Sequence, residues 1–159
     1  AVMYFVIVAV SEEGSKFVLL KWRTWNRPSF NCQFDGVVYS VFVALGFALW
    51  ENISYVFMYG LGTAMVRAVT AVPGHACFGV FMGVFYGLAK RYENIGEFGR
   101  SKAFLILSFA LPALLHGTYD FLATLQSTSL GLLFVPFIIV LFIISWRLVV
   151  SMSKRDRYI

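Results

Sequence analysis

Apolar residues fill five long runs of this 159-residue chain, and only short polar connections separate them. A helix needs roughly 20 predominantly apolar residues to cross the hydrocarbon core of a bilayer. The runs approach or exceed that length, and they cover about residues 1–25, 36–59, 63–90, 102–125 and 129–151. The sequence therefore predicts an all-α protein, a polytopic transmembrane bundle of about five spanning helices.

The balance of residue types supports a membrane protein. Hydrophobic residues make up 60% of the chain and charged residues only 13%, whereas about a quarter of the residues in a soluble domain are charged. The net charge of +5 is concentrated in the short connections, so it indicates topology and not a nucleic-acid partner. Cys32 and Cys77 have neither the spacing of a metal site nor that of a disulfide framework.

Lysine and arginine occur at alternate ends of the expected helices. The connections at residues 21–35 and 90–102 and the tail at 154–157 are basic, whereas residues 60–62 and 126–128 carry no charge. The positive-inside rule assigns the basic loops and the C-terminus to the cytoplasm. The first expected helix then runs from the outside to the inside along the chain.

Glu12, Glu13 and Lys16 interrupt the first apolar run. A charged group at the centre of a membrane helix costs about 2.5–3.5 kcal/mol on insertion scales, so such groups usually have a partner or a function. Lys16 follows Glu12 by four residues and Glu13 by three, within reach of either. For this segment alone, a structural ion pair that fixes helix packing remains an equal alternative.

Three later runs also contain deep polar residues. They are Glu51 and Asn52 in the second run, His75 in the third, and His116 and Asp120 in the fourth. His116 and Asp120 are four residues apart, so they share one helical face. Taken singly, each of these residues can be explained as a hydrogen-bonded packing residue. Separately, the GxxxG spacings of Gly79, Gly83 and Gly87 in the third run indicate close helix packing.

The deep polar residues of the four runs are expected at similar depths in the membrane. Counted from the cytoplasmic ends, the deep ionisable groups lie about 11–18 residues into their helices, or about 16–27 Å at a rise of 1.5 Å per residue. Four helices therefore bring ionisable groups to one layer of the membrane. We interpret this coincidence as a single shared polar site.

Three chemistries suit a site of this composition. A desolvated glutamate can act as general base on water, with histidines polarising the scissile carbonyl or stabilising the oxyanion. Alternatively, histidine and carboxylate ligands can hold a zinc ion whose bound water is the nucleophile. The third possibility is a non-hydrolytic ion or proton relay. The residues alone leave these three alternatives open.

Ordered motifs in the chain resemble those of one protease family. Glu12 to Lys16 matches an EExxK motif, Phe47 to Asn52 matches FxxxEN, and His116 to Asp120 matches HGxYD; His75 with Gly79 resembles a further motif between them. Together these resemble PrsW-type glutamic intramembrane proteases, relatives of CAAX prenyl endopeptidases and bacteriocin-immunity proteins. The CAAX pattern has FxxxH where this chain has Glu51-Asn52, so the role of Glu51 is not carried over.

The resemblance implies an activity. Family members are bacterial inner-membrane endopeptidases that make the site-1 cut in a single-pass anti-sigma factor. It implies that Glu12 activates water, with His75 and His116 among its helpers. It also implies spanning helices before the EExxK motif, and we expect residues 1–159 not to include them. We expect residues 1–159 to form a single integral membrane protease domain with a CAAX-protease-like core.

Combining residues and resemblance, we expect a glutamic endopeptidase in the bacterial inner membrane, without a cofactor, and with zinc as the alternative. Its expected catalytic residues are Glu12, Glu13, His75, His116 and Asp120, and its expected supporting residues are Lys16, Glu51 and Asn52. Glu12 is the preferred base, Glu13 accepts bonds from a neighbouring helix, and Lys16 balances their charge. Asp120 orients His116, while Glu51 and Asn52 form the opposite wall. The expected partners are the lipid bilayer and the single-pass substrate, which we expect to be cut near its extracytoplasmic end.

Overall fold

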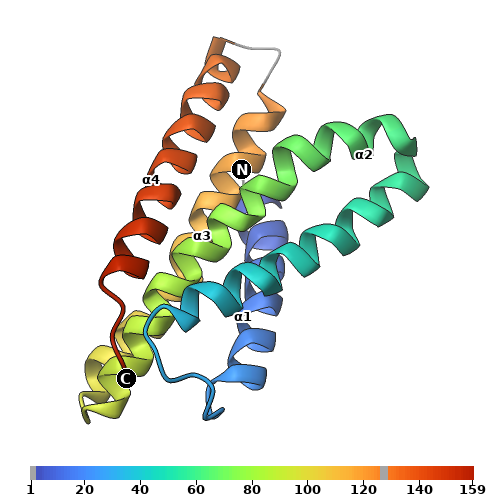
Figure 1. Ribbon diagram of the computed structural model, residues 1–159. Coiled ribbons are helices and arrows are strands. Elements are labelled where there is room, and N and C mark those ends of the chain that lie inside the picture. Colours follow the sequence, from blue (N-terminus) through green and yellow to red (C-terminus); the bar gives the residue numbers. More distant parts are fainter. Residues whose placement is uncertain (1–2, 126–128) are drawn as a thin grey trace.

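The computed structural model describes residues 3–125 and 129–159, which form helices joined by short connections (Figure 1). The helices are η1 (Met3–Ala9, a π-helix), α1 (Val10–Thr24), α2 (Asp35–Asn94), α3 (Phe98–Thr124), η2 (Ser129–Leu133, a 3₁₀ turn) and α4 (Phe134–Lys154). The described residues contain no strand apart from an isolated bridge between Cys32 and Tyr158. The expected all-α class is thus confirmed. The uncharged connection expected at residues 126–128 lies outside the described residues.

The 60-residue helix α2 is a hairpin. Gly60 has φ 83° and ψ 171°, a conformation open to glycine, and the helix reverses there (Figure 1). A straight helix of this length would span about 90 Å, three times the hydrocarbon thickness of a membrane. We refer to residues 35–59 as the first arm and to residues 61–94 as the second arm. They correspond to the second and third expected spans, although a single residue breaks the helix where we expected a three-residue connection.

Glycines bring the two arms of α2 into backbone contact. A Cβ atom added to Gly79 would lie 2.9 Å from Ala44 Cβ, and one added to Gly83 would collide with Ser40 and the backbone of Val37. The approach also allows Ser40 Oγ to donate a hydrogen bond to the carbonyl oxygen of Gly79 at 2.6 Å. The GxxxG spacings therefore act in helix packing, with the first arm as their partner.

At the end of the molecule that carries the basic connections, α1 packs on the second arm. Leu20, Trp25, Met82 and Tyr86 form a buried cluster there, and Tyr86 hydrogen-bonds Thr24 through the two hydroxyls at 2.8 Å. The C-terminal tail lies at the same end (Figure 1) and pairs with the connection between α1 and α2 through backbone hydrogen bonds. These contacts fix where α1 enters the bundle.

Three helices in the described part of the chain are long and apolar enough to cross a membrane: Asp35–Asn94, Phe98–Thr124 and Gly131–Lys154. This is fewer than the five expected spans for two reasons. The range Asp35–Asn94 contains both arms of the α2 hairpin and so accounts for two expected spans, and α1 is a 15-residue helix that carries five charged residues. The helical bundle is confirmed, whereas the expected number of about five spanning helices is only approximate.

Candidate active site

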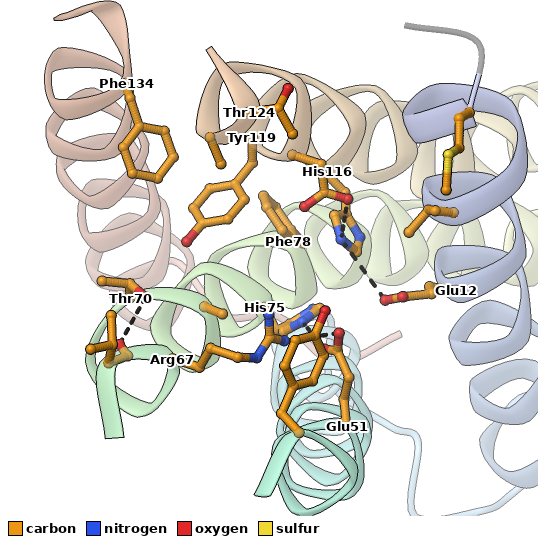
Figure 2. Close-up of a pocket in the computed structure, with 17 residues that line it drawn as sticks. Glu12, Glu51, Arg67, Thr70, His75, Phe78, His116, Tyr119, Thr124 and Phe134 are labelled. Carbon is orange, nitrogen blue, oxygen red and sulfur yellow. Dashed lines mark hydrogen bonds and ion pairs between the residues drawn. The ribbon is translucent and has the colours of Figure 1, made fainter. Parts of the chain in front are cut away.

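A cavity of about 580 Å³ lies between α1, both arms of α2, and α3 (Figure 2). Its acidic, basic and histidine lining residues are Glu12 from α1, Glu51 from the first arm, Arg67 and His75 from the second arm, and His116 and Asp120 from α3. Phe78, Tyr119 and Phe134 supply aromatic walls. The structure thus brings together side chains from all four segments in which sequence reasoning found deep polar groups.

Glu12 and Glu13 have different surroundings although they are neighbours in the chain. Glu12 lines the cavity, and its side chain is 18% exposed. Glu13 is completely buried behind it, and its Oε1 accepts hydrogen bonds from Lys16 Nζ at 2.6 Å and from His116 Nδ1 at 2.9 Å. The Oε2 atoms of both glutamates are buried without a hydrogen-bond partner, but only Glu12 lines the cavity. Of the two carboxylates, Glu12 is therefore the one available to a bound molecule.

His116 is held in a fixed orientation. Its ring stacks on Phe78 with the centroids 5.0 Å apart, and its Nδ1 is bound to Glu13. Because an ionised carboxylate only accepts hydrogen bonds, Nδ1 carries a proton. The other ring nitrogen, Nε2, lies 3.5 Å from Asp120 Oδ2 and 3.8 Å from Glu12 Oε2. Both distances exceed a normal hydrogen bond, so Nε2 remains available to a substrate group.

His75 lies between Lys16 and Glu51. Lys16 Nζ is 3.0 Å from its Nδ1, and Glu51 Oε2 is 2.9 Å from its Nε2. The lysine ammonium group has only donors, and Glu13 balances its charge, so Nδ1 must be the acceptor. The ring proton of the neutral histidine is then on Nε2 and is donated to Glu51. Both nitrogens of His75 are therefore engaged by the protein itself.

Donor atoms of Glu12, His75 and His116 lie within 4.8 Å of one another. Two histidines and a glutamate are the ligands of some catalytic zinc sites, so the set matches a metal site in kind. A metal ligand must offer a lone pair, however, and His75 has none free in this arrangement because Lys16 occupies Nδ1 and the Nε2 proton faces Glu51. His75 therefore does not fit as a ligand.

Two residues differ from what sequence reasoning suggested. Asn52, expected in the cavity wall beside Glu51, does not line the cavity; its Nδ2 donates to the carbonyl oxygen of Ala64 at 3.2 Å and joins the two arms. Arg67, which sequence reasoning missed, does line the cavity and pairs with Glu51 at 2.8 Å. The sequence contains a signal that could have identified Arg67, because it is the single arginine or lysine between Thr63 and Ala89.

Comparison with known proteins yields one family. Residues 1–148 match the family described as PrsW family intramembrane metalloprotease. The chain is 35% identical to Protease PrsW of Halalkalibacterium halodurans over 153 residues, which cover 96% of this chain and 69% of that protein. It is 38% identical to Protease PrsW of Bacillus subtilis over 149 residues, which cover 92% of this chain and 63% of that protein. No solved structure is significantly similar.

The chain is also similar to Protease PrsW of Shouchella clausii, with 34% identity over 155 residues, which cover 97% of this chain and 68% of that protein. The chain spans between 50% and 69% of the length of the curated relatives that it matches. The match extends over almost the whole chain and includes α1, α2 and α3, which carry the charged and histidine residues of the cavity. The chain belongs to the PrsW family of intramembrane proteases.

Proposed function

We propose that this chain forms the catalytic core of an intramembrane endopeptidase in which Glu12 activates a water molecule. The observation that carries the proposal is the contrast between the two adjacent glutamates. Each glutamate has one oxygen without a hydrogen-bond partner, but Glu12 lines the cavity, whereas Glu13 is completely buried and holds Lys16 and His116. A general base needs a free lone pair directed at the reacting water, and Glu12 has one.

The reaction proceeds by general-base hydrolysis. Glu12 takes a proton from water while the water oxygen attacks the carbonyl carbon of the scissile peptide bond. The tetrahedral oxyanion that forms needs positioned donors in a water-poor site. When the carbon–nitrogen bond breaks, Glu12 returns the proton to the leaving nitrogen, and the products are a carboxylic acid and an amine.

His116 is the oxyanion partner in this scheme. Its Nε2 faces the space between Glu12 and Asp120, and a second ring proton on Nε2 provides the donor. Three carboxylates surround the ring, Glu13 on one side and Glu12 and Asp120 on the other, and they stabilise the doubly protonated form. Asp120 and Glu13 hold the ring in orientation, and His75 forms the facing wall.

We derive no step through a metal ion. The matched family is described as intramembrane metalloprotease, and the donor set of Glu12, His75 and His116 has the composition of a zinc site. The hydrogen bonds of His75 do not fit that function, because binding a metal through Nε2 requires the proton that now faces Glu51 to move and Lys16 to stop donating to Nδ1. A metal content measurement decides between these arrangements.

The substrate class follows from the family resemblance and from the membrane setting. We infer a single-pass membrane protein, and for a site-1 function a membrane-anchored anti-sigma factor. The basic connections and the C-terminus lie in the cytoplasm of a bacterial cell in this proposal. A substrate helix must unwind to expose a carbonyl, which is easier near the outer interface, where water satisfies the freed backbone groups.

Turnover by purified protein in proteoliposomes tests the proposal. Wild-type protein should cut a single-pass substrate, and Glu12→Gln should reduce the rate by about 10²–10⁴-fold, the contribution expected from a general base. Glu97→Gln is a matched control, because Glu97 is exposed and pairs only with Arg100 on the surface in the described structure. Full activity of Glu12→Gln, or an inactive wild type against a panel of single-pass substrates, contradicts the proposal.

A further inference from the structure

Arg67 is a charged residue of the cavity that the proposed mechanism does not use. It lies on the second arm of α2, eight residues before His75, and both residues line the cavity with Ala71 between them. Spacings of four residues keep side chains on neighbouring parts of one helix surface. An arginine within a membrane helix is costly and usually has a function. The contacts of Arg67 indicate what this function is.

The guanidinium group of Arg67 is fixed on two sides. One of its terminal nitrogens lies 2.8 Å from Glu51 Oε1. Its central carbon lies 3.6 Å from the centre of the Tyr55 ring, a close cation–π contact (Figure 2 shows Arg67 beside Glu51 and His75). A planar cation that is paired and stacked in this way holds its partner in a defined orientation.

Glu51 uses its two oxygens for different partners. Oε1 accepts from Arg67, and Oε2 accepts from His75 Nε2 at 2.9 Å. Because Arg67 is paired with Oε1, the Glu51 carboxylate cannot rotate away from His75 without breaking the Arg67–Glu51 ion pair. Arg67 therefore acts on His75 without touching it, because it fixes the acceptor that receives the ring proton.

A purely structural explanation is that Arg67 ties the two arms of α2 together. The arms already meet at Gly79 and Gly83, where their backbones are in contact, and Asn52 bonds Ala64 near the bend. An apolar residue at position 67 would pack between the arms without the cost of a buried charge. Packing alone thus does not account for an arginine that faces the cavity.

We propose that Arg67 is a positioning residue, which acts through Glu51 to hold His75 with its proton on Nε2 and its Nδ1 accepting from Lys16. The ion pair fixes the carboxylate, the carboxylate fixes the ring proton, and the ring presents one defined face to the cavity. The catalytic consequence of this arrangement rests on the proposed endopeptidase function. The state of the His75 ring does not, and it can be measured without a substrate.

The chain contains two histidines, so nitrogen-15 labelling of histidine gives a spectrum of two rings. His116→Gln identifies the signals of His75. In the wild type, we expect one protonated and one unprotonated nitrogen in His75, with the proton on Nε2. In Arg67→Gln, the Nε2 signal of His75 should shift because Glu51 is no longer held and the hydrogen bond from Nε2 weakens, whereas Lys16 keeps Nδ1 unprotonated. The signals of His116 should stay in place.

Two further variants show whether Arg67 acts through Glu51. Glu51→Gln should shift the His75 signals, and adding Arg67→Gln to it should produce little further change, because the connecting carboxylate is already gone. Lys90→Gln is the matched control, since it removes a paired cation from the same arm at the other end of the helix. It should leave both rings as in the wild type.

With a cleavable substrate, Arg67→Gln should lower kcat by up to about 100-fold, because the His75 ring, which packs against His116 with the centroids 5.1 Å apart, is no longer held in place. Its KM should remain near the wild-type value, because the guanidinium group of Arg67 is already paired with Glu51 and stacked on Tyr55. If Arg67→Gln does not fold, Arg67→Met keeps the side-chain length without a polar group and should shift the His75 signals in the same way. Unchanged His75 signals in the folded variant, or equal shifts from Arg67→Gln with and without Glu51, overturn the proposal.

Discussion

Nδ1 of His116 lies 2.9 Å from Oε1 of Glu13, although 103 positions separate the two residues in the chain. The same oxygen accepts from Lys16 at 2.6 Å, so one buried carboxylate joins α1 to α3 and neutralises a lysine. Its neighbour Glu12 takes part in no comparable contact and faces the cavity. The two adjacent glutamates therefore have separate tasks, and substitutions should separate them.

Glu13→Gln should destabilise the protein, whereas Glu12→Gln should not. The substitution at Glu13 leaves the buried Lys16 without a charge partner, and breaking a buried ion pair costs about 3–5 kcal/mol. The Glu12 side chain is partly exposed and lies 4.0 Å from Lys16, too far for a hydrogen bond. Thermal unfolding of both variants in the same detergent checks the difference. Equal melting temperatures would show that Glu13 does not hold the bundle together.

Active protein should contain no stoichiometric zinc, and chelators should not inhibit it. The reason is the hydrogen-bond arrangement of His75, which leaves no free lone pair for a metal. Elemental analysis of a sample with measured turnover provides the check, together with dialysis against a chelator. One zinc per chain, with activity that is lost on chelation and restored by the metal, would establish the zinc mechanism instead.

The substrate should be cut at or just beyond the extracytoplasmic end of its spanning segment. Glu51, His116 and Asp120 all line the cavity, and counting along the helices from the basic connections puts them beyond the middle of the membrane. Hydrolysis requires the base, the water and the oxyanion donor to meet one peptide bond. Mass spectrometry of both fragments locates the cut. A cut in the cytoplasmic half of the segment is incompatible with the proposed orientation.

Gly83→Ala should destabilise the α2 hairpin. The added Cβ collides with Ser40 and the backbone of Val37, so the arms must separate, and overpacking of this kind costs about 1–3 kcal/mol. Gly46→Ala is the matched control on the other arm, because a Cβ there meets nothing within 4 Å. Alanine is the better helix former, so the control should be neutral or slightly stabilising. Comparison of unfolding temperatures tests the pair.

The sequence predicted the helical class and the convergence of the deep polar residues, because both follow from length, hydropathy and helical periodicity. The spacing of Gly79, Gly83 and Gly87 predicted a close backbone approach at this helix, and the structure identifies the first arm as the partner. The pairing of His116 with Asp120 followed from their separation of four residues. Each of these inferences needed only local geometry.

Other features depend on how helices rotate about their own axes, which no single segment determines. Asn52 is adjacent to Glu51, but a step of one residue turns a side chain by about 100°, and Asn52 points to Ala64 instead of the cavity. Arg67 was overlooked because its depth alone does not reveal its partner in the first arm. The position of the break at Gly60 depended on one positive φ angle, which the pattern Gly60-Leu61-Gly62 left undecided.

The hairpin of α2 has a consequence for how the protein is made. Glu51 and His75 are 24 residues apart, whereas Glu13 and His116 are 103 apart. By loop-closure entropy, joining the second pair costs about 1.3 kcal/mol more than joining the first. As the chain leaves the ribosome, we expect the Glu51–His75 wall to assemble once the hairpin has entered the bilayer. In the proposed mechanism, the nascent chain then has half of its site and lacks His116 as oxyanion partner, so we expect it to be inactive until α3 inserts.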